Sequence, residues 1–275
     1  MINISKNKVL KLSICEISES SFKKEIFKGK IIIINISDEM KEIIDVTNRY
    51  FFEIFDSTKN NLINSKSKHE LNRFFNILQS RVKNCKILRN NFKIFLEKLG
   101  FTSSKTFMDM ITLRYSPAKG RQKLGSLKPA PPHRDTWASN IFNQINLWIP
   151  IHDVKQDNSI FIVPRYFKEK VENNSSSWSY DLYKKTKKYK SVPEAKIIIN
   201  EKEKIKFNLN KGEVLFFSGQ HLHGSKIGVN QRINLETRIA DRDDINLYNI
   251  PANLDSSSKK KKTKWFRNLE TQEYY

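Results

Sequence analysis

The sequence predicts an α+β protein with a mainly β core, in which a largely helical N-terminal region packs on a β domain. Two patterns lead to this prediction. Through residues 1–106, apolar side chains recur at the spacing of an amphipathic helix. After residue 106, short apolar runs alternate with turn-forming residues, which is typical of strands. At 275 residues the chain can bury one large core, so we expect one main domain.

The N-terminal region is expected to contain a buried strand followed by helices. The run GKIIIINIS, residues 29–37, is rich in β-branched side chains and predicts the strand. Ser37 can cap a helix that starts directly after it, because its hydroxyl can accept a hydrogen bond from a free backbone N–H. Apolar side chains at helical spacing predict two further helices over residues 69–82 and 86–99, and Gly100 is expected to end the second one.

The β domain is expected to span residues 107–245. Strands are predicted within six stretches, residues 107–117, 143–154, 158–167, 195–209, 212–225 and 232–240. Turns as frequent as these favour a sandwich or a barrel over alternating strand and helix units.

Two segments depart from this pattern. Residues 172–190 are polar, basic and rich in tyrosine, and an insertion of this length in a compact fold predicts a lid or a flexible loop. Residues 246–275 form a basic tail with a block of lysines at residues 259–262. We expect this tail to be disordered or to bind a partner.

The composition is strongly basic, with 50 Lys and Arg against 29 Asp and Glu and a net charge of +21. Such a charge favours an anionic partner, although an AT-rich genome would also produce lysines spread over nearly every segment. Cys15 and Cys85 are the only cysteines, so we expect free thiols. No segment has the apolar run of a signal peptide or a membrane span, and we therefore expect a cytoplasmic protein.

Candidate metal ligands occur in two places in the β domain. His133 and Asp135 are two positions apart and would share one face of a strand. His221 and His223 have the same spacing much later in the chain, and either can complete a three-ligand site with the first pair. Two imidazoles and one carboxylate form the facial triad of non-haem iron oxygenases, although a zinc hydrolase can use the same ligands.

Two arginines downstream of the second histidine pair favour the iron interpretation. On a strand, Arg232, Asn234, Glu236 and Arg238 would share one face. A buried guanidinium stays charged and donates two parallel hydrogen bonds to a carboxylate, which is what a dicarboxylate co-substrate requires.

In these motifs the chain resembles the iron(II)- and 2-oxoglutarate-dependent dioxygenases, most closely the phytanoyl-CoA dioxygenase-like family. The resemblance covers roughly residues 108–241 and rests on HRD at 133–135, KGEVLFF at 211–217, HGS at 223–225, Asn230, and RIN at 232–234. It implies a double-stranded β-helix, the jelly-roll or cupin-like barrel, for the catalytic core. It also implies Fe(II) as the cofactor, with 2-oxoglutarate and O2 as co-substrates.

The resemblance also assigns roles to individual residues. It makes His133, Asp135 and His223 the iron ligands, and it leaves His221 outside the site. It makes Arg232 the partner of the distal carboxylate of 2-oxoglutarate.

One position departs from the family pattern. A small hydroxyl residue often lies two positions after the co-substrate arginine, whereas this chain has Asn234 there, so Arg238 remains the alternative arginine.

The carboxylate ligand matters as well, because related halogenases lack it so that chloride can bind iron. Asp135 therefore implies hydroxylation of an unactivated carbon, with release of succinate and CO2.

Six further side chains are candidates for the pocket: Gln144, Asn146, Trp148, Arg114, Tyr115 and Arg165. The first three alternate on an expected strand and can point toward the co-substrate, although Trp148 fits the core equally well. Arg114 and Tyr115 lie just ahead of the triad and can line the pocket. Arg165 can meet an anionic substrate or form a surface ion pair.

A small-molecule substrate is expected, and the basic residues near the tyrosines of 172–190 weakly favour an anionic one. A second class of function is a nucleic-acid-binding or nucleic-acid-modifying protein on the same barrel, whose basic segments contact phosphates while aromatic side chains stack on bases. It would show strongly salt-dependent binding and no need for iron. A non-catalytic barrel is disfavoured, because all three ligands and an arginine are present.

Overall fold

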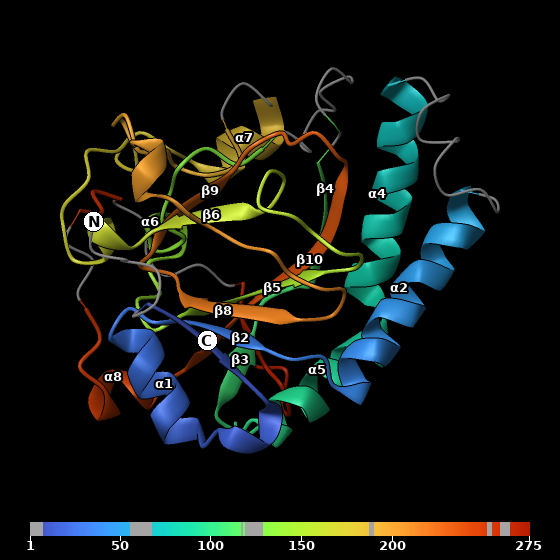
Figure 1. The fold of residues 1–275 in the computed structure, drawn as a ribbon, viewed down its shortest axis with the longest axis horizontal. Coiled ribbons are helices and arrows are strands. Elements are labelled where there is room, and N and C mark those ends of the chain that lie inside the picture. Colours follow the sequence, from blue (N-terminus) through green and yellow to red (C-terminus); the bar gives the residue numbers. More distant parts are fainter. Residues whose placement is uncertain are drawn as a thin grey trace.

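The structure consists of two β-sheets with helices packed against the larger one (Figure 1). The computed structural model describes residues 8–55, 68–116, 118, 129–186, 190–251, 255–258 and 265–275. Residues 187–189 of the expected lid and the lysine block at 259–262 lie outside the described residues. The predicted fold class is confirmed, since a mainly β core of the jelly-roll type carries a helical N-terminal region.

The large sheet forms most of the core. Its strands are β1 (Val9–Leu12), β2 (Ile31–Ile34), β3 (Thr106–Met108), β4 (Thr112–Ser116), β5 (Ile145–Pro150), β8 (Val214–Ser218), β10 (Arg232–Asp241) and β11 (Arg267–Asn268). Their order is β1-β2-β8-β5-β10-β3-β11, and β4 also pairs with β10. Strands β1 and β2 are parallel, whereas the other pairs are antiparallel.

The small sheet has the order β7-β6-β9. Its strands are β6 (Ile160–Val163), β7 (Ile205–Lys206) and β9 (Leu222–Ser225). In Figure 1, β6 and β9 lie on one side of β5 and β8, and the first helices of the chain lie on the other side. The large sheet is therefore buried on both faces.

The main helices are α1 (Glu19–Phe27), α2 (Asp38–Phe55), α4 (Lys68–Asn84) and α5 (Lys86–Lys98). Shorter ones are α6 (Thr136–Ser139), α7 (Tyr180–Thr186), α8 (Asp244–Leu247) and the 3-10 turns η1 (Ile14–Glu16), η3 (Pro164–Phe167) and η4 (Glu201–Glu203). The expected cap of α2 is present, because the Ser37 hydroxyl accepts a hydrogen bond from the backbone N–H of Met40 at 3.3 Å. Gly100 follows α5 with φ +91°, the left-handed conformation that ends many helices.

Strand β2 shows why the core has two layers. All four of its isoleucines are buried, although side chains alternate along a strand. Ile32 and Ile34 pack with the apolar faces of the helices, whereas Ile31 and Ile33 pack with residues between the sheets. A strand that is covered on both faces needs a continuous apolar run, which explains the unbroken isoleucine sequence.

Three features differ from the sequence-based expectations. The N-terminal region contributes strands β1 and β2 to the large sheet, so it is part of the β core as well as packed on it. Only two residues of the expected strand 195–209 pair as β7, and the side chain of Ile198 is 99% exposed. The last residues of the expected basic tail return to the sheet, where β11 pairs with β3 and Phe266 is fully buried.

Two absences apply to the described residues only. None of their helices has both the length and the apolar composition needed to cross a membrane. Cys15 and Cys85 are both free thiols, the first exposed and the second buried.

Candidate active site

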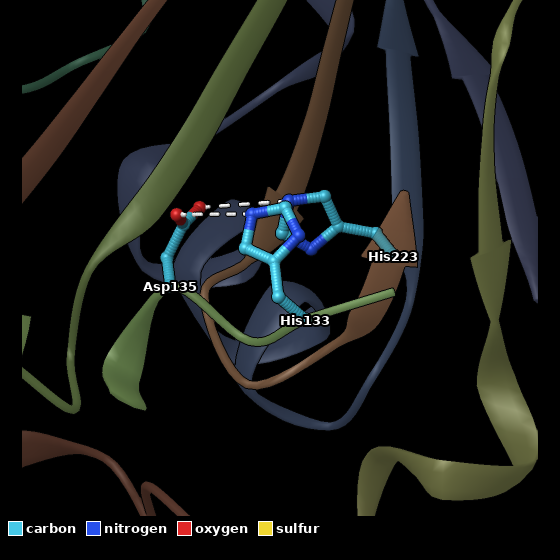
Figure 2. A group of neighbouring side chains, drawn as sticks. All are labelled: His133, Asp135 and His223. Carbon is cyan, nitrogen blue, oxygen red and sulfur yellow. Dashed lines mark ion pairs between the residues drawn. The ribbon is translucent and has the colours of Figure 1, made fainter. Parts of the chain in front are cut away.

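Three potential metal ligands converge near the facing sheets, as Figure 2 shows. The ligand atoms of His133, Asp135 and His223 all lie within 4.8 Å of one another. Each imidazole Nε2 is 3.7 Å from an oxygen of the Asp135 carboxylate, and the two rings lie side by side with their centroids 4.3 Å apart. Among the described residues, this is the one group of histidine, cysteine and acidic side chains with such a geometry.

The hydrogen bonds of both imidazoles suit a metal ion. Nδ1 of His133 is 2.8 Å from the carbonyl oxygen of Pro131, and Nδ1 of His223 is 3.0 Å from that of His221. A carbonyl oxygen can only accept, so each Nδ1 carries the proton and each Nε2 presents its lone pair to the site. Burial, helped by the nearby His133, lowers the pKa of His223 to about 4, so this ring is neutral at pH 7 and able to bind a metal.

The local backbone brings the ligands together in a different way from the one that the sequence suggested. His133 forms a single antiparallel bridge with His223 of β9, whereas Asp135 lies in a helical conformation at the start of α6. The two residues therefore do not share a strand face. His221 lies in the turn before β9, and its Nε2 faces the carbonyl oxygen of Gly29 at 3.2 Å. The expected alternation of the two histidines on one strand is thus wrong, and only His223 reaches the triad.

The Asp135 carboxylate is held by neighbours on the large sheet. Nδ2 of Asn146 on β5 donates to Oδ2 at 2.6 Å, and Nη1 of Arg238 on β10 is 3.6 Å from Oδ1. Burial alone would raise the pKa of Asp135, but the neighbouring His133 and the charge of Arg238 outweigh it and hold the pKa below its usual range. The group is therefore an anionic ligand at any physiological pH.

The two arginines on β10 differ in their partners. Arg238 forms an ion pair with the buried Asp109 through both Nε, at 2.9 Å, and Nη2. Burial alone would lower the pKa of Arg238, but the charges of Asp109 and Asp135 raise it above its ordinary value. Arg232 is 3% exposed and makes no ion pair within the described part of the chain. A buried guanidinium without a carboxylate partner fits an anionic ligand.

Neighbouring polar groups orient the Arg232 guanidinium. Its Nε donates to Oδ1 of Asn234 at 3.0 Å, and its Nη1 donates to the backbone carbonyl of Asn158 at 2.6 Å. Its carbon Cζ lies 5.6 Å from the centroid of the Trp148 ring. Burial lowers the pKa of Arg232 to about 10, so the side chain stays charged at pH 7. Asn234 thus occupies the position of the small hydroxyl residue and holds the arginine through a side-chain oxygen.

Two buried polar groups beside Arg232 have no hydrogen-bond partner: the Trp148 indole N–H and the Ser116 hydroxyl. Both residues line the cavity, and Ser116 is the cross-strand partner of Arg232. Buried polar groups are normally paired, so unpaired donors beside an unpaired cation fit a carboxylate ligand. Ser116 is a residue of the cavity that the sequence patterns did not indicate. The available signal was its alternation with Arg114 on the same strand.

A cavity of about 340 Å³ joins these groups. It is lined by the triad, by Arg232 and Arg238, and by side chains from α4, β4, α7 and the C-terminal segment. Asn146, Trp148 and Tyr115 line it, as the sequence suggested. Trp265, which no sequence pattern indicated, also lines the cavity, and its ring lies 5.1 Å from Cζ of Arg238.

Two other expected pocket residues do not line the cavity. Arg165 in η3 is exposed and forms ion pairs with Glu169 at 3.2 Å and Glu203 at 2.7 Å. Of its two expected roles, the structure therefore shows the surface ion pair. Gln144 is fully buried one residue before β5, and its side-chain carbonyl accepts a hydrogen bond from the Ser139 hydroxyl at 2.9 Å.

The residue between the two first ligands anchors their loop. Arg134 points away from the triad, and its Nε donates to the buried Asp255 carboxylate at 3.0 Å. Asp255 also accepts from the Trp137 indole N–H at 2.6 Å and from the backbone N–H of Val171 at 3.0 Å. The C-terminal segment is thereby tied to the loop that carries two of the three ligands.

Comparisons with known proteins match the chain to one family. The family described as Phytanoyl-CoA dioxygenase (PhyH) matches residues 51–232, more than half of the chain. No curated protein sequence matches. Among solved structures, EvdO2 from Micromonospora carbonacea var. aurantiaca, complexed with 2-oxoglutarate, is 9% identical, with a TM-score of 0.50 over 80% of this chain and 90% of EvdO2. The epimerase SnoN, solved with Fe3+, alpha-ketoglutarate and nogalamycin RO, is 12% identical, with a TM-score of 0.45 over 81% of this chain and 83% of SnoN.

Proposed function

The chain belongs to the phytanoyl-CoA dioxygenase family, whose members depend on Fe(II), 2-oxoglutarate and O2, and we propose that it hydroxylates an unactivated carbon of a small molecule. Succinate and CO2 would be the co-products. The observation that carries this proposal is the triad of His133, Asp135 and His223, whose ligand atoms lie within 4.8 Å of one another beside an unpaired buried arginine.

Each polar residue of the site has a definite task in this proposal. His133 and His223 would present neutral Nε2 atoms, and Asp135 one oxygen, to an iron ion on one face. Bound there, iron(II) would supply the activation of O2 that oxidation of an unactivated carbon requires. Asn146 keeps the carboxylate oriented, since it donates to Oδ2 at 2.6 Å.

The co-substrate would be held at its far end by protein groups. Arg232 would bind the distal carboxylate of 2-oxoglutarate, with Ser116 and Trp148 as further donors because each has a buried, unpaired polar group that lines the cavity. Arg238 is a weaker candidate because Asp109 already neutralises it. Its task would be to hold Asp135.

Residues 172–190 are proposed to act as a lid. The support is that Tyr180 and Tyr183 on α7 line the cavity, and that Tyr180 meets Trp265 edge to face with the ring centroids 5.3 Å apart. A lid excludes water and completes a site without holding the co-substrate. Tyr183→Ala should therefore leave 2-oxoglutarate affinity unchanged and lower substrate-dependent turnover, and unchanged turnover would contradict the lid.

Anaerobic reconstitution tests the proposed function directly. Wild-type protein mixed with Fe(II) and 2-oxoglutarate should show the weak visible charge-transfer band of the iron chelate, and admission of O2 should then produce succinate. His223→Ala is the matched control and should show neither, because a facial triad has no spare protein ligand to replace the lost imidazole. A wild-type protein that binds iron but gives neither band nor succinate would contradict the proposal.

A further inference from the structure

A second pair of charged side chains faces the cavity beyond the triad and Arg232. Nε of Arg114 on β4 is 3.1 Å from Oε2 of Glu236 on β10. Both residues line the cavity, and their side chains are 37% and 32% exposed, respectively. They therefore remain accessible to a small molecule, whereas Arg232 is buried.

Both members of this pair have unused hydrogen-bonding capacity. Arg114 donates only through Nε, and its two terminal nitrogens have no hydrogen-bond partner within the described part of the chain. These nitrogens form the fork that binds a carboxylate through two parallel bonds. Glu236 accepts one bond at each oxygen, from Arg114 and from Nδ2 of Asn234 at 3.0 Å, and a carboxylate can accept about four.

Most of the other charged side chains that line the cavity already have a partner or a proposed ligand, and the exception is Lys83 of α4, which is exposed. Arg238 is already paired with Asp109. In the proposed function, Asp135 would face the iron ion, and Arg232 would face the distal carboxylate of 2-oxoglutarate. A polyanion would meet repulsion from Glu236, whereas a molecule with one positive and one negative group would be matched on both sides.

Apolar and aromatic surfaces surround the pair. Tyr115, next to Arg114, lines the cavity and stacks on Phe75 of α4 with ring centroids 4.5 Å apart. Tyr183 of α7 lines the same cavity as the pair, so α7 contributes a further aromatic ring there. A substrate held at the pair would thus have apolar side chains beside its carbon skeleton.

We propose that Arg114 and Glu236 recognise the substrate, and that this substrate is a zwitterion of the α-amino acid kind. Arg114 binds its carboxylate, and Glu236 binds its ammonium group. An α-amino acid carries both groups on one carbon, so they are close together, as the two side chains are. The inference rests on the proposed function, because it names the substrate class of the same site.

Binding measurements with charge-deleted ligands test the pair. Calorimetric titrations of the common L-amino acids into anaerobic protein loaded with Fe(II) and 2-oxoglutarate should identify at least one ligand. Its carboxamide and its N-acetyl derivative each lack one charge, and each should bind about thirty-fold more weakly or worse. An acyl-coenzyme A thioester serves as the polyanionic probe and should not compete.

Variants show which side chain meets which group. Arg114→Ala should weaken binding of the free amino acid about thirty-fold but leave binding of its carboxamide unchanged, because the lost contact is already missing. Glu236→Gln should show the same selectivity for the N-acetyl derivative. Arg114→Lys should recover part of the affinity, because an ammonium keeps the charge without the fork. Arg165→Ala, which removes an arginine paired with glutamates outside the cavity, is the matched control and should change nothing.

Several outcomes would overturn the proposal. One is that no amino acid binds the wild-type protein loaded with Fe(II) and 2-oxoglutarate, and another is that the acyl-coenzyme A thioester binds in preference. The others are equal affinities for the free amino acid and its charge-deleted derivatives, and an equal loss of affinity for the free amino acid and its carboxamide in Arg114→Ala. The loading step separates these outcomes from failure of the proposed function. If 2-oxoglutarate itself does not bind the iron-loaded wild type, both proposals fail, whereas normal 2-oxoglutarate binding with any outcome above removes only the substrate class.

Discussion

Truncation of Arg232 is the sharpest test of how the site holds 2-oxoglutarate. Arg232 is 3% exposed, has no ion-pair partner among the described residues, and stays protonated at pH 7 because burial lowers its pKa only to about 10. Loss of one partner of a buried charged pair costs about 2 to 5 kcal/mol, or roughly thirty-fold to several thousand-fold in affinity. Arg232→Ala should therefore weaken 2-oxoglutarate binding by that factor.

The same substitution should leave the rest of the protein intact. In the free protein, Arg232 is a buried cation without a carboxylate, and burial of such a group is unfavourable. We therefore expect Arg232→Ala to unfold in denaturant at the same concentration as wild type or a higher one, and to bind iron normally. Arg232→Lys should restore only part of the affinity, because an ammonium cannot form two parallel bonds.

Arg238→Ala provides the contrast. It would leave Asp109 buried without its partner and remove a charge 3.6 Å from Asp135, so we expect lower stability and weaker iron binding with a much smaller change in 2-oxoglutarate affinity. Anaerobic titration of 2-oxoglutarate into each iron-loaded variant, followed by the visible band, distinguishes the two arginines. Equal affinities for wild type and Arg232→Ala would refute the reasoning.

Four further predictions follow from the contacts described above. His223→Ala should abolish iron binding measured by equilibrium dialysis, whereas His221→Gln should bind iron nearly normally, and the reverse result would exchange their roles. His221 has its pKa lowered to about 3 by burial, so the unfolded chain takes up a proton below pH ~6.5 that the folded chain does not. The free energy of unfolding should thus fall as the pH is lowered below ~6.5, and it should fall more steeply in wild type than in His221→Gln. The difference in slope should reach about 1.4 kcal/mol per pH unit, and urea unfolding at several pH values measures it. Trp148→Phe should weaken 2-oxoglutarate binding by about 0.5 to 1.5 kcal/mol in the anaerobic titration, since one donor is lost, and no change would remove this indole from the site. Asp255→Ala should lower the free energy of unfolding by about 3 to 5 kcal/mol, because Arg134 would remain buried without its partner, and an unchanged urea midpoint would contradict this.

Elements that depend on near neighbours could be predicted from the sequence. The buried strand β2, the cap at Ser37 and the end of α5 at Gly100 all follow from residues within a few positions of each other. The order of the motifs was enough to indicate the family, which the match over residues 51–232 confirms. The isoleucines at 197–199 show the limit, because an apolar run forms a strand only where a partner strand is available, and Ile198 is 99% exposed.

The choice among candidate site residues required the tertiary structure. His221 and His223 look equivalent in the sequence, and the turn before β9 turns one of them away. Arg232 and Arg238 share a strand face, and only the contact with Asp109, which lies far away in the chain, neutralises one of them. The physical reason is that alternation and helical spacing depend on local backbone geometry, whereas the charge, burial and hydrogen bonds of a side chain depend on segments that folding brings together.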